Sequence, residues 1–146
     1  MTQTQRCFLL VEDDDDHAEI VMRTLTSHNA SRRIDRVRDG VEALRYLRNQ
    51  SPFEATPVPD LVLLDLSLPR VDGHQVLEEL KSDEDLRRIP VVVLTTSSAA
   101  ADKEKAYSNH VNSYLVKPMD FEGFRAQIRG LDEYWGEWNR VMPGSA

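Results

Sequence analysis

The sequence predicts an α/β fold in which a mostly parallel sheet is covered by helices. Short, continuously apolar runs, such as residues 7–11 and 61–66, are typical of strands that are buried on both faces. Segments with apolar residues at helical spacing separate these runs, so a strand followed by a helix occurs five times along the chain. The 146 residues, of which 40% are hydrophobic, suit a single domain with one three-layer core.

The first two strand–helix units precede a long loop at residues 49–60. Residues 7–11 form the first strand, and the helix after it begins in an acidic run, with Asp16 and Glu19 as a candidate capping box. The second strand, at residues 34–37, is weaker, and Asp39 and Glu42 are candidate caps of the short helix that follows it. The loop contains three prolines and no periodic pattern.

Three further units follow this loop. Ser97 or Ser98 is the candidate cap of the fourth helix, and Asn109 is the candidate for a left-handed residue at its end. The expected elements are, in order, a strand at residues 61–66, a helix around residues 76–80, a strand after Pro90, a helix at residues 97–109, a strand at residues 114–116 and a helix from Asp120 to about Met142.

Composition and charge exclude several classes of protein. The formal net charge of −7 argues against a surface that binds nucleic acid or an anionic membrane. No apolar run approaches the roughly 20 residues that span a bilayer. The polar start of the chain, MTQTQR, does not resemble a signal peptide, so we expect a cytoplasmic location. The single cysteine, Cys7, rules out a disulfide within the chain and is expected in the core.

Polar side chains stand where the predicted strands end. Glu12 and Asp13 follow the first strand, Asp65 interrupts the third near its end, Thr95 ends the fourth, and Lys117 follows the fifth. The carboxyl ends of parallel strands share one edge of the sheet, so these groups should converge. Three close carboxylates repel one another unless a cation neutralises them, and oxygen ligands suit Mg²⁺. The sequence therefore predicts a magnesium site at this edge.

The same residues suggest phosphoryl transfer. A carboxylate at position 65 is placed to act as a nucleophile toward phosphorus, which would give an aspartyl phosphate. Mg²⁺ and Lys117 would stabilise the oxygens of the transferring group, and Thr95 would donate a hydrogen bond to one of them. The neighbouring residues Asp14, Asp15 and Asp16 are interpreted as helix caps and solvent-facing charge.

Together with the residues around them, these strand-end groups make residues 6–130 resemble a receiver domain of the two-component response-regulator family. The string DLSLPRVDG around Asp65, the acid pair Glu12-Asp13, Thr95, and Lys117 followed by Pro118 carry the resemblance. It implies a flavodoxin-like (βα)5 sandwich of strand order 2-1-3-4-5 and a signalling phosphoacceptor rather than an enzyme. Phosphate would come from a phosphohistidine on a sensor histidine kinase or from a small phosphodonor.

The resemblance also implies details of the site. The backbone carbonyl of Ser67 would join Glu12, Asp13 and Asp65 around Mg²⁺, for which Mn²⁺ or Ca²⁺ can substitute. The Lys117–Pro118 bond would be cis, and Ser67 and Ser97 would tune dephosphorylation. Phosphorylation would draw Thr95 toward the phosphoryl group and let Tyr114 rotate inward, which would repack the surface of the fourth helix, fifth strand and fifth helix.

A narrower resemblance concerns the partner kinase. The long loop at residues 49–60, the strings LPRVDGHQVL and IPVVVLTTSS, and the aromatic C-terminus are similar to stand-alone regulators that pair with bacterial phytochrome kinases. We therefore expect a single-domain regulator whose partner is a sensor histidine kinase of the bacteriophytochrome kind.

Residues 131–146 are expected to extend the fifth helix and to end in a frayed segment. Aromatic and aliphatic residues recur three and four positions apart, as in a heptad stripe along a helix of roughly 33 Å. The first half of this stripe is expected to pack on the sheet, and the tryptophans are expected to form a homodimer contact, with intramolecular packing or kinase docking as alternatives. The stripe consists of Phe121, Phe124, Ile128, Leu131, Trp135, Trp138 and Met142.

Two other functions use part of the same pattern. A phosphatase of the haloacid dehalogenase kind also has an Asp at a strand end, but it carries a second acid two residues later, where this chain has Ser67. A pseudo-receiver that serves only as a dimerisation scaffold would not need the full set of site residues. The presence of the acid pair, Asp65, Thr95 and Lys117 argues against that scaffold.

Overall fold

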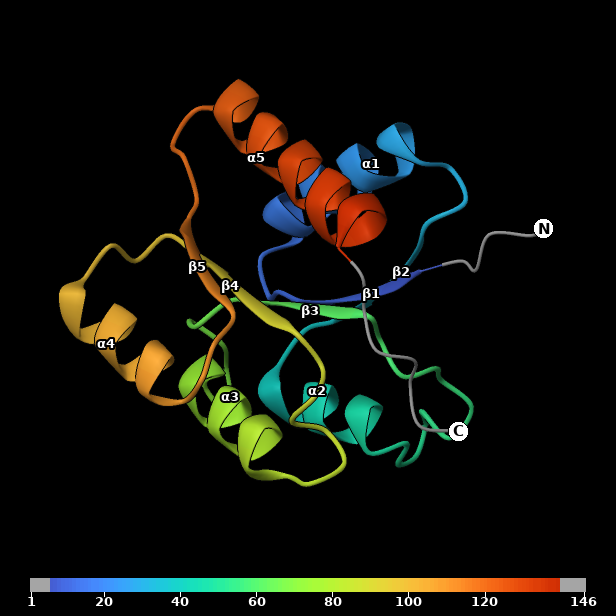
Figure 1. Ribbon diagram of the computed structural model, residues 1–146, viewed down its shortest axis with the longest axis vertical. Coiled ribbons are helices and arrows are strands. Elements are labelled where there is room, and N and C mark those ends of the chain that lie inside the picture. The colour runs from blue at the N-terminus through green and yellow to red at the C-terminus, as the bar shows by residue number, and fades with distance from the viewer. Residues whose placement is uncertain (1–5, 140–146) are drawn as a thin grey trace.

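Five parallel strands form one sheet in the order β2-β1-β3-β4-β5, which confirms the predicted flavodoxin-like topology (Figure 1). The computed structural model describes residues 6–139. None of the helices in this range is both long and apolar enough to cross a bilayer. The elements are β1 (Cys7–Val11), α1 (Asp15–His28), β2 (Arg33–Val37), α2 (Gly40–Leu47), β3 (Leu61–Leu64), α3 (Gly73–Ser82), β4 (Val91–Thr95), α4 (Ala100–Ser108), β5 (Ser113–Val116), α5 (Phe121–Glu133) and a π-helical segment, η1 (Tyr134–Trp138).

The sheet separates two apolar layers. Helices α1 and α5 cover one face, and α2, α3 and α4 cover the other (Figure 1). Side chains alternate between these layers along each strand: in β1, Phe8 and Leu10 pack toward α1 and α5, while Leu9 and Val11 pack toward the other helices. Every residue of β1, β3 and β4 is buried, because both faces of the sheet are covered.

An aspartate side chain caps the N-terminus of four of the five α-helices. Asp14 caps α1 by accepting hydrogen bonds from the backbone N–H groups of Asp16 and His17, at 2.9 and 3.0 Å. The predicted capping box of Asp16 and Glu19 is therefore wrong, because the helix starts at Asp15 and the cap lies one residue before it. Asp39 caps α2 as predicted. The two other aspartate caps are Asp72 of α3 and Asp120 of α5.

The ends of α4 differ from the prediction. The helix starts at Ala100, and Ala99 before it has no side chain that can cap it. Ser97 is not the cap, because its hydroxyl donates to the Asp102 carboxylate at 2.5 Å and so remains outside the helix. At the other end, Asn109 has a φ of −96° and the left-handed residue is His110, with a φ of 64°.

The fifth helix does not continue as a regular α-helix to Met142. It passes into η1 at Tyr134, where the N–H of Asn139 donates to the Tyr134 carbonyl five residues back, at 2.6 Å. A Cβ at Gly136 would lie 2.3 Å from Arg32 Nη2, so a larger residue there would have to displace that guanidinium from beside the widened turn. Met142 lies outside the described residues.

Buried ionic contacts fix the C-terminal end of α5 to the C-terminal end of α1 and to the turn before β2. The Asp132 carboxylate accepts from Arg32 Nε at 2.7 Å and lies 2.5 Å from His28 Nδ1. The Arg32 guanidinium also stacks over the Phe8 ring, 5.1 Å from its centroid. Arg6 donates to the Trp135 carbonyl. These contacts attach the segment after Leu131 to its own domain.

Burial confirms that the first half of the C-terminal stripe packs mainly on the sheet, which removes three of its residues from any partner surface. Phe124, Ile128 and Leu131 pack into the layer beneath α1 and α5, so they are not available to a second molecule. Trp135 packs against the edge of the same layer. Phe121 and Trp138 remain 55% and 67% exposed. The stripe therefore stabilises the fold along most of its length, because the sheet below α5 needs an apolar cover.

Candidate functional site

Strand register brings the predicted site residues to one edge of the sheet. Val11 pairs with Leu64, so Glu12 and Asp65 both follow directly after paired residues of β1 and β3. The N–H of Asp65 donates to the Val11 carbonyl at 3.1 Å, which holds the ends of strands β1 and β3 together. Asp65 lies one residue beyond β3, which is two residues shorter than predicted because its ladder ends at Leu64.

Three carboxylates meet at this edge. One oxygen each from Glu12, Asp13 and Asp65 can be chosen so that all three lie within 4.8 Å of one another. Glu12 and Asp65 are 2% and 8% exposed, whereas Asp13 faces solvent. Ser67 lies beside them, and its N–H donates to Asp65 Oδ1 at 3.2 Å. This set of close oxygens, open on the Asp13 side, fits a hard divalent cation that keeps part of its water shell.

Lys117 joins the acids from the end of β5. Its Nζ lies 2.5 Å from Glu12 Oε1 and 3.1 Å from Asp65 Oδ2, and its side chain is almost fully buried. Thr95 of β4 pairs with Val116, and the N–H of Lys117 donates to the Thr95 carbonyl at 2.7 Å. The ammonium group therefore compensates the charge of two buried carboxylates, which would otherwise be strongly unfavourable.

The peptide bond after Lys117 is trans, which corrects the expectation of a cis bond there. Among residues 6–139, the cis peptide bond is Ser51–Pro52 in the long loop. A trans bond before proline is the lower-energy form by about 0.5–1 kcal/mol. With the trans bond, Lys117 Nζ already reaches both Glu12 and Asp65.

His17 is a member of the site that sequence reasoning missed. Lys117 Nζ donates to His17 Nδ1 at 2.9 Å, so the three N–H groups of the ammonium have three acceptors. The ring of His17 packs edge-on against Phe124, with 5.9 Å between the centroids. The only sequence signal is a histidine in the first turn of the helix that follows the acidic run, and its contact with a residue 100 positions away has no local signature.

Burial changes the acidity of Glu12. Loss of solvent raises the pKa of Glu12 to about 7, an effect that the hydrogen bond from Lys117 opposes. At neutral pH, a proton therefore competes with any cation for this carboxylate.

This competition predicts a pH-dependent metal affinity. The apparent Mg²⁺ affinity should fall as the pH drops below about 7, by up to about tenfold per pH unit, because a proton on Glu12 would compete with a cation for that carboxylate. Above pH 8 the affinity should level off. Calorimetric titration with Mg²⁺ at pH 6, 7 and 8 checks this, and equal affinities at pH 6 and 8 would contradict it.

Thr95 and Tyr114 lie on either side of Ser97. Thr95 is fully buried, and its Oγ1 accepts from the N–H of Ser97 at 3.4 Å. Tyr114 is partly buried, and its hydroxyl donates to the carbonyl of Ser97 at 2.9 Å. The two residues that the resemblance assigns to the switch are therefore both bonded to the loop between β4 and α4.

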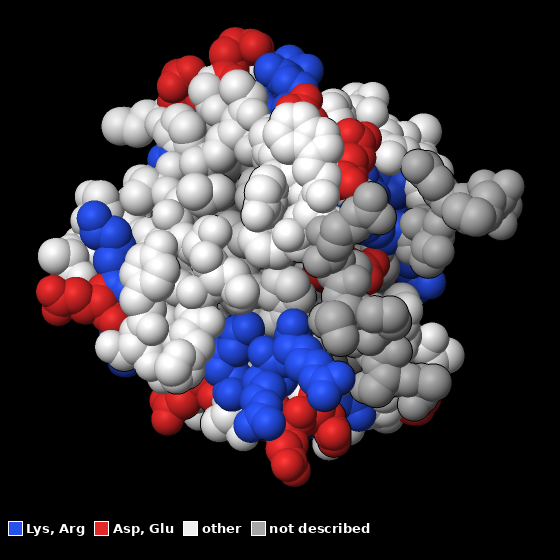
Figure 2. Space-filling view, viewed as in Figure 1, with Lys and Arg blue, Asp and Glu red and all other residues white. Residues whose placement is uncertain are grey.

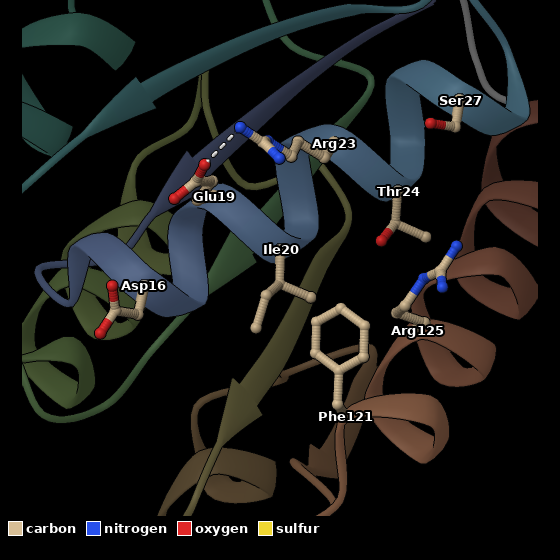
Figure 3. A pocket seen from close by; sticks show the side chains of 8 residues that line it. All are labelled: Asp16, Glu19, Ile20, Arg23, Thr24, Ser27, Phe121 and Arg125. Atoms are coloured by element: carbon tan, nitrogen blue, oxygen red, sulfur yellow. Dashed lines mark ion pairs between the residues drawn. The ribbon is translucent and has the colours of Figure 1, made fainter.

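A groove runs along α1, between that helix and the first half of α5 (Figure 3). Its volume is about 510 Å³, and Ile20 and Phe121 face each other across it. Charged side chains of both signs border this apolar centre; Glu19 and Arg23 form an ion pair at 2.7 Å on the α1 side. The groove is lined by Asp16, Glu19, Ile20, Arg23, Thr24, Ser27, Phe121 and Arg125.

Comparison with curated proteins gives relatives that span nearly the whole chain. The chain is 51% identical over 138 residues to the probable methanogenesis regulatory protein FilR2 of Methanothrix harundinacea, covering 94% of this chain and 88% of that protein. It is 39% identical over 132 residues to the response regulator Rcp1 of Synechocystis, covering 90% of each.

Solved structures share both the fold and a good part of the sequence. The phosphorylated cyanobacterial phytochrome response regulator RcpA superimposes with a TM-score of 0.93 at 36% identity, covering 96% of this chain and 100% of that one. The Mn²⁺-bound form of Rcp1 gives a TM-score of 0.90 at 38% identity, covering 94% and 99%. The sequence model of the response regulator receiver domain matches residues 8–129. The chain belongs to the response regulator receiver domain family.

Proposed function

We propose that Asp65 accepts a phosphoryl group from a phosphohistidine of a sensor histidine kinase, in a reaction that requires Mg²⁺. The observation that carries this proposal is the position of the Asp65 carboxylate, 3.1 Å from Lys117 Nζ and within a set of three close acids. Residues 6–130 form the receiver unit of this proposal. The likeness to Rcp1 and RcpA favours a kinase of the phytochrome kind as donor.

The chemistry follows from the groups around Asp65. A carboxylate oxygen attacks phosphorus, the P–N bond of the phosphohistidine breaks, and its electron pair stays on the imidazole nitrogen. Lys117, beside Asp65 Oδ2, stabilises the negative charge on the transferring oxygens. Mg²⁺, held by Glu12, Asp13, Asp65 and the Ser67 carbonyl, supplies further positive charge when bound.

Phosphorylation acts as a switch because it changes the charge at one buried point. The new group adds about −1.5 to −2 of charge and three acceptor oxygens at Asp65. Thr95 turns its hydroxyl toward those oxygens and gives up the N–H of Ser97. Tyr114 then leaves the Ser97 carbonyl and moves inward, which repacks the surface of α4, β5 and α5. Ser67 and Ser97, next to the aspartyl phosphate, influence how readily water reaches it.

Incubation with acetyl phosphate tests this function. The intact mass of the protein should increase by one phosphoryl group in the presence of Mg²⁺ and not in the presence of a chelator. Asp65→Asn should abolish the increase, whereas Asp16→Asn, at an exposed acid of α1, should leave it unchanged. A wild-type protein that gains no phosphate would refute the proposal.

The groove between α1 and α5 is our candidate for the surface that receives the kinase (Figure 3). It has an apolar centre and a mixed-charge border, and α1 begins just after Glu12 and Asp13. Ile20→Glu should slow phosphotransfer from an autophosphorylated phytochrome kinase by about tenfold or more, because it places a charge in the apolar centre. Labelling by acetyl phosphate, which needs no docking, should be unchanged.

Ile20→Val is the matched control, since it keeps the groove apolar. An Ile20→Glu protein that accepts phosphate from the kinase at the wild-type rate would show that the kinase binds elsewhere. Equal slowing with acetyl phosphate would show damage to the site itself.

We further propose that the surface of α4, β5 and α5, which phosphorylation repacks, binds protein, including a second copy of this chain. Figure 2 shows that the area over α4, β5 and α5 carries few charged side chains, which gather at its margins. Leu115, Gln127, Tyr134 and Trp135 line a hollow of about 500 Å³ there. Tyr134 and Trp138 are exposed one helical turn apart at the end of this region.

A variant with both Tyr134→Ser and Trp138→Ser is therefore expected to be monomeric where the wild type is a dimer. Removing two exposed aromatic side chains takes away contact area without touching the buried layer. Light scattering after size exclusion gives the mass of each protein, and Val58→Ser, at an exposed residue of the long loop, is the control. A wild type that is monomeric with and without phosphate would contradict the dimer.

A further inference from the structure

The loop between β4 and α4 is held through Ser97. Its N–H donates to Thr95 Oγ1 at 3.4 Å, its carbonyl accepts from the Tyr114 hydroxyl at 2.9 Å, and its own hydroxyl donates to Asp102 Oδ2 at 2.5 Å. One residue therefore connects both switch residues to the first turn of α4. Anything that fixes Ser97 also fixes Thr95 and Tyr114.

Asp102 is in turn bonded to α3. Its second oxygen, Oδ1, lies 3.0 Å from Nε2 of His74, a buried residue in the first turn of α3. The first turn of α3 packs closely against the backbone of Asp65, because a Cβ at Gly73 would come within 2.3 Å of the Asp65 carbonyl oxygen. The chain of contacts from His74 through Asp102 to Ser97, which we call the brace, thus runs from the backbone beside Asp65 to the switch loop.

Helix α4 has little else to hold it. Ala106 is the only residue of α4 that is buried, and no side chain caps its N-terminus. An element with so little apolar contact is poised to move, and its polar attachments decide its position. The Ser97 hydroxyl and His74 lower the pKa of Asp102, which agrees with hydrogen bonds that favour the ionised carboxylate.

We propose that His74 and Asp102 are positioning residues that hold Ser97, and through it Thr95 and Tyr114, in the unphosphorylated arrangement. This inference rests on the proposed phosphorylation of Asp65. Movement of Thr95 toward a phosphoryl group stretches the 3.4 Å hydrogen bond that it accepts from the N–H of Ser97, so phosphorylation should become faster as the fraction of molecules with a released β4–α4 loop grows.

The size of the effect follows from the bonds in the brace. Hydrogen bonds to a charged group are stronger than neutral ones, and Asp102 takes part in two of them at a partly exposed position. Their removal should raise the population of the released loop, and with it the phosphorylation rate, by about tenfold.

The test is the initial rate of Asp65 labelling by subsaturating acetyl phosphate and Mg²⁺, followed by intact mass. Asp102→Ala and His74→Ala should each label faster than wild type, by up to about tenfold. Asp102→Asn and His74→Gln retain part of the hydrogen bonding and should fall between these variants and the wild type. Glu104→Ala removes an exposed charge from the same helix and should label at the wild-type rate.

Amide hydrogen exchange of residues 96–103 in the unphosphorylated proteins provides a second measurement. Exchange should be faster in Asp102→Ala and His74→Ala than in Glu104→Ala. If Asp102→Ala does not unfold cooperatively, the two His74 variants carry the test. If the His74 and Asp102 variants label and exchange like the wild type, the brace is refuted and the proposed phosphorylation of Asp65 is not. The same conclusion follows if Glu104→Ala is accelerated as much as they are. A wild type that takes no phosphate overturns the proposed function and the brace with it.

Discussion

Lys117→Met is expected to slow the phosphorylation of Asp65 by about 100-fold, because it removes the positive charge that stabilises the transferring oxygens. Methionine nearly matches the lysine stem in volume, so the buried space between Glu12 and Asp65 stays filled. The measurement is the labelling rate with acetyl phosphate at saturating Mg²⁺.

The same substitution should strengthen Mg²⁺ binding, because Lys117 Nζ competes for the oxygens of Glu12 and Asp65. Lys81→Met is a matched control. Lys81 is partly buried, whereas Lys117 is almost fully buried; Lys81 Nζ donates to the carbonyls of Arg87 and Ile89, and Lys81 lies at the distant end of α3. Slow labelling by Lys81→Met, or unimpaired labelling by Lys117→Met, would contradict the role assigned to Lys117.

Asp13→Asn is expected to weaken Mg²⁺ binding by about tenfold or more, since it replaces the solvent-facing carboxylate of the three with a neutral amide. Labelling should slow at low Mg²⁺ and recover as the concentration rises, because Asp65 and Lys117 remain in place. The free energy of unfolding should hardly change at this exposed position.

Asp16→Asn serves as control, since it removes the same charge from an exposed position one turn away. If Asp13→Asn labelled normally at low Mg²⁺, Asp13 would not be a ligand. If saturating Mg²⁺ failed to restore the rate, its role would extend beyond metal binding.

Strand ends explain why so much of the site could be predicted from the sequence. Apolar runs identify buried strands, and parallel strands bring their carboxyl ends to one edge, so Glu12, Asp65 and Lys117 follow from the pattern. The register of β1 with β3 then places two of them side by side. His17 could not be found in this way, because its contact with Lys117 depends on the direction of one side chain on α1.

The C-terminal stripe shows the opposite case. Helical spacing predicted an apolar face correctly, but spacing alone does not tell whether a sheet or a second molecule covers it. The sheet covers Phe124 and Ile128, and the ion pair of Arg32 with Asp132, 100 residues apart, fixes the end of the helix. A pairing over that distance leaves no pattern in either local segment.

The most direct test of the account identifies the residue that carries the phosphate. Borohydride reduces an acyl phosphate and converts a phosphorylated aspartate to homoserine, which tandem mass spectrometry of peptides can place in the sequence. After treatment with acetyl phosphate and Mg²⁺, we expect homoserine at position 65 and at no other acid. Homoserine at position 13, or labelling that persists in Asp65→Asn, would contradict Asp65 as the phosphoacceptor.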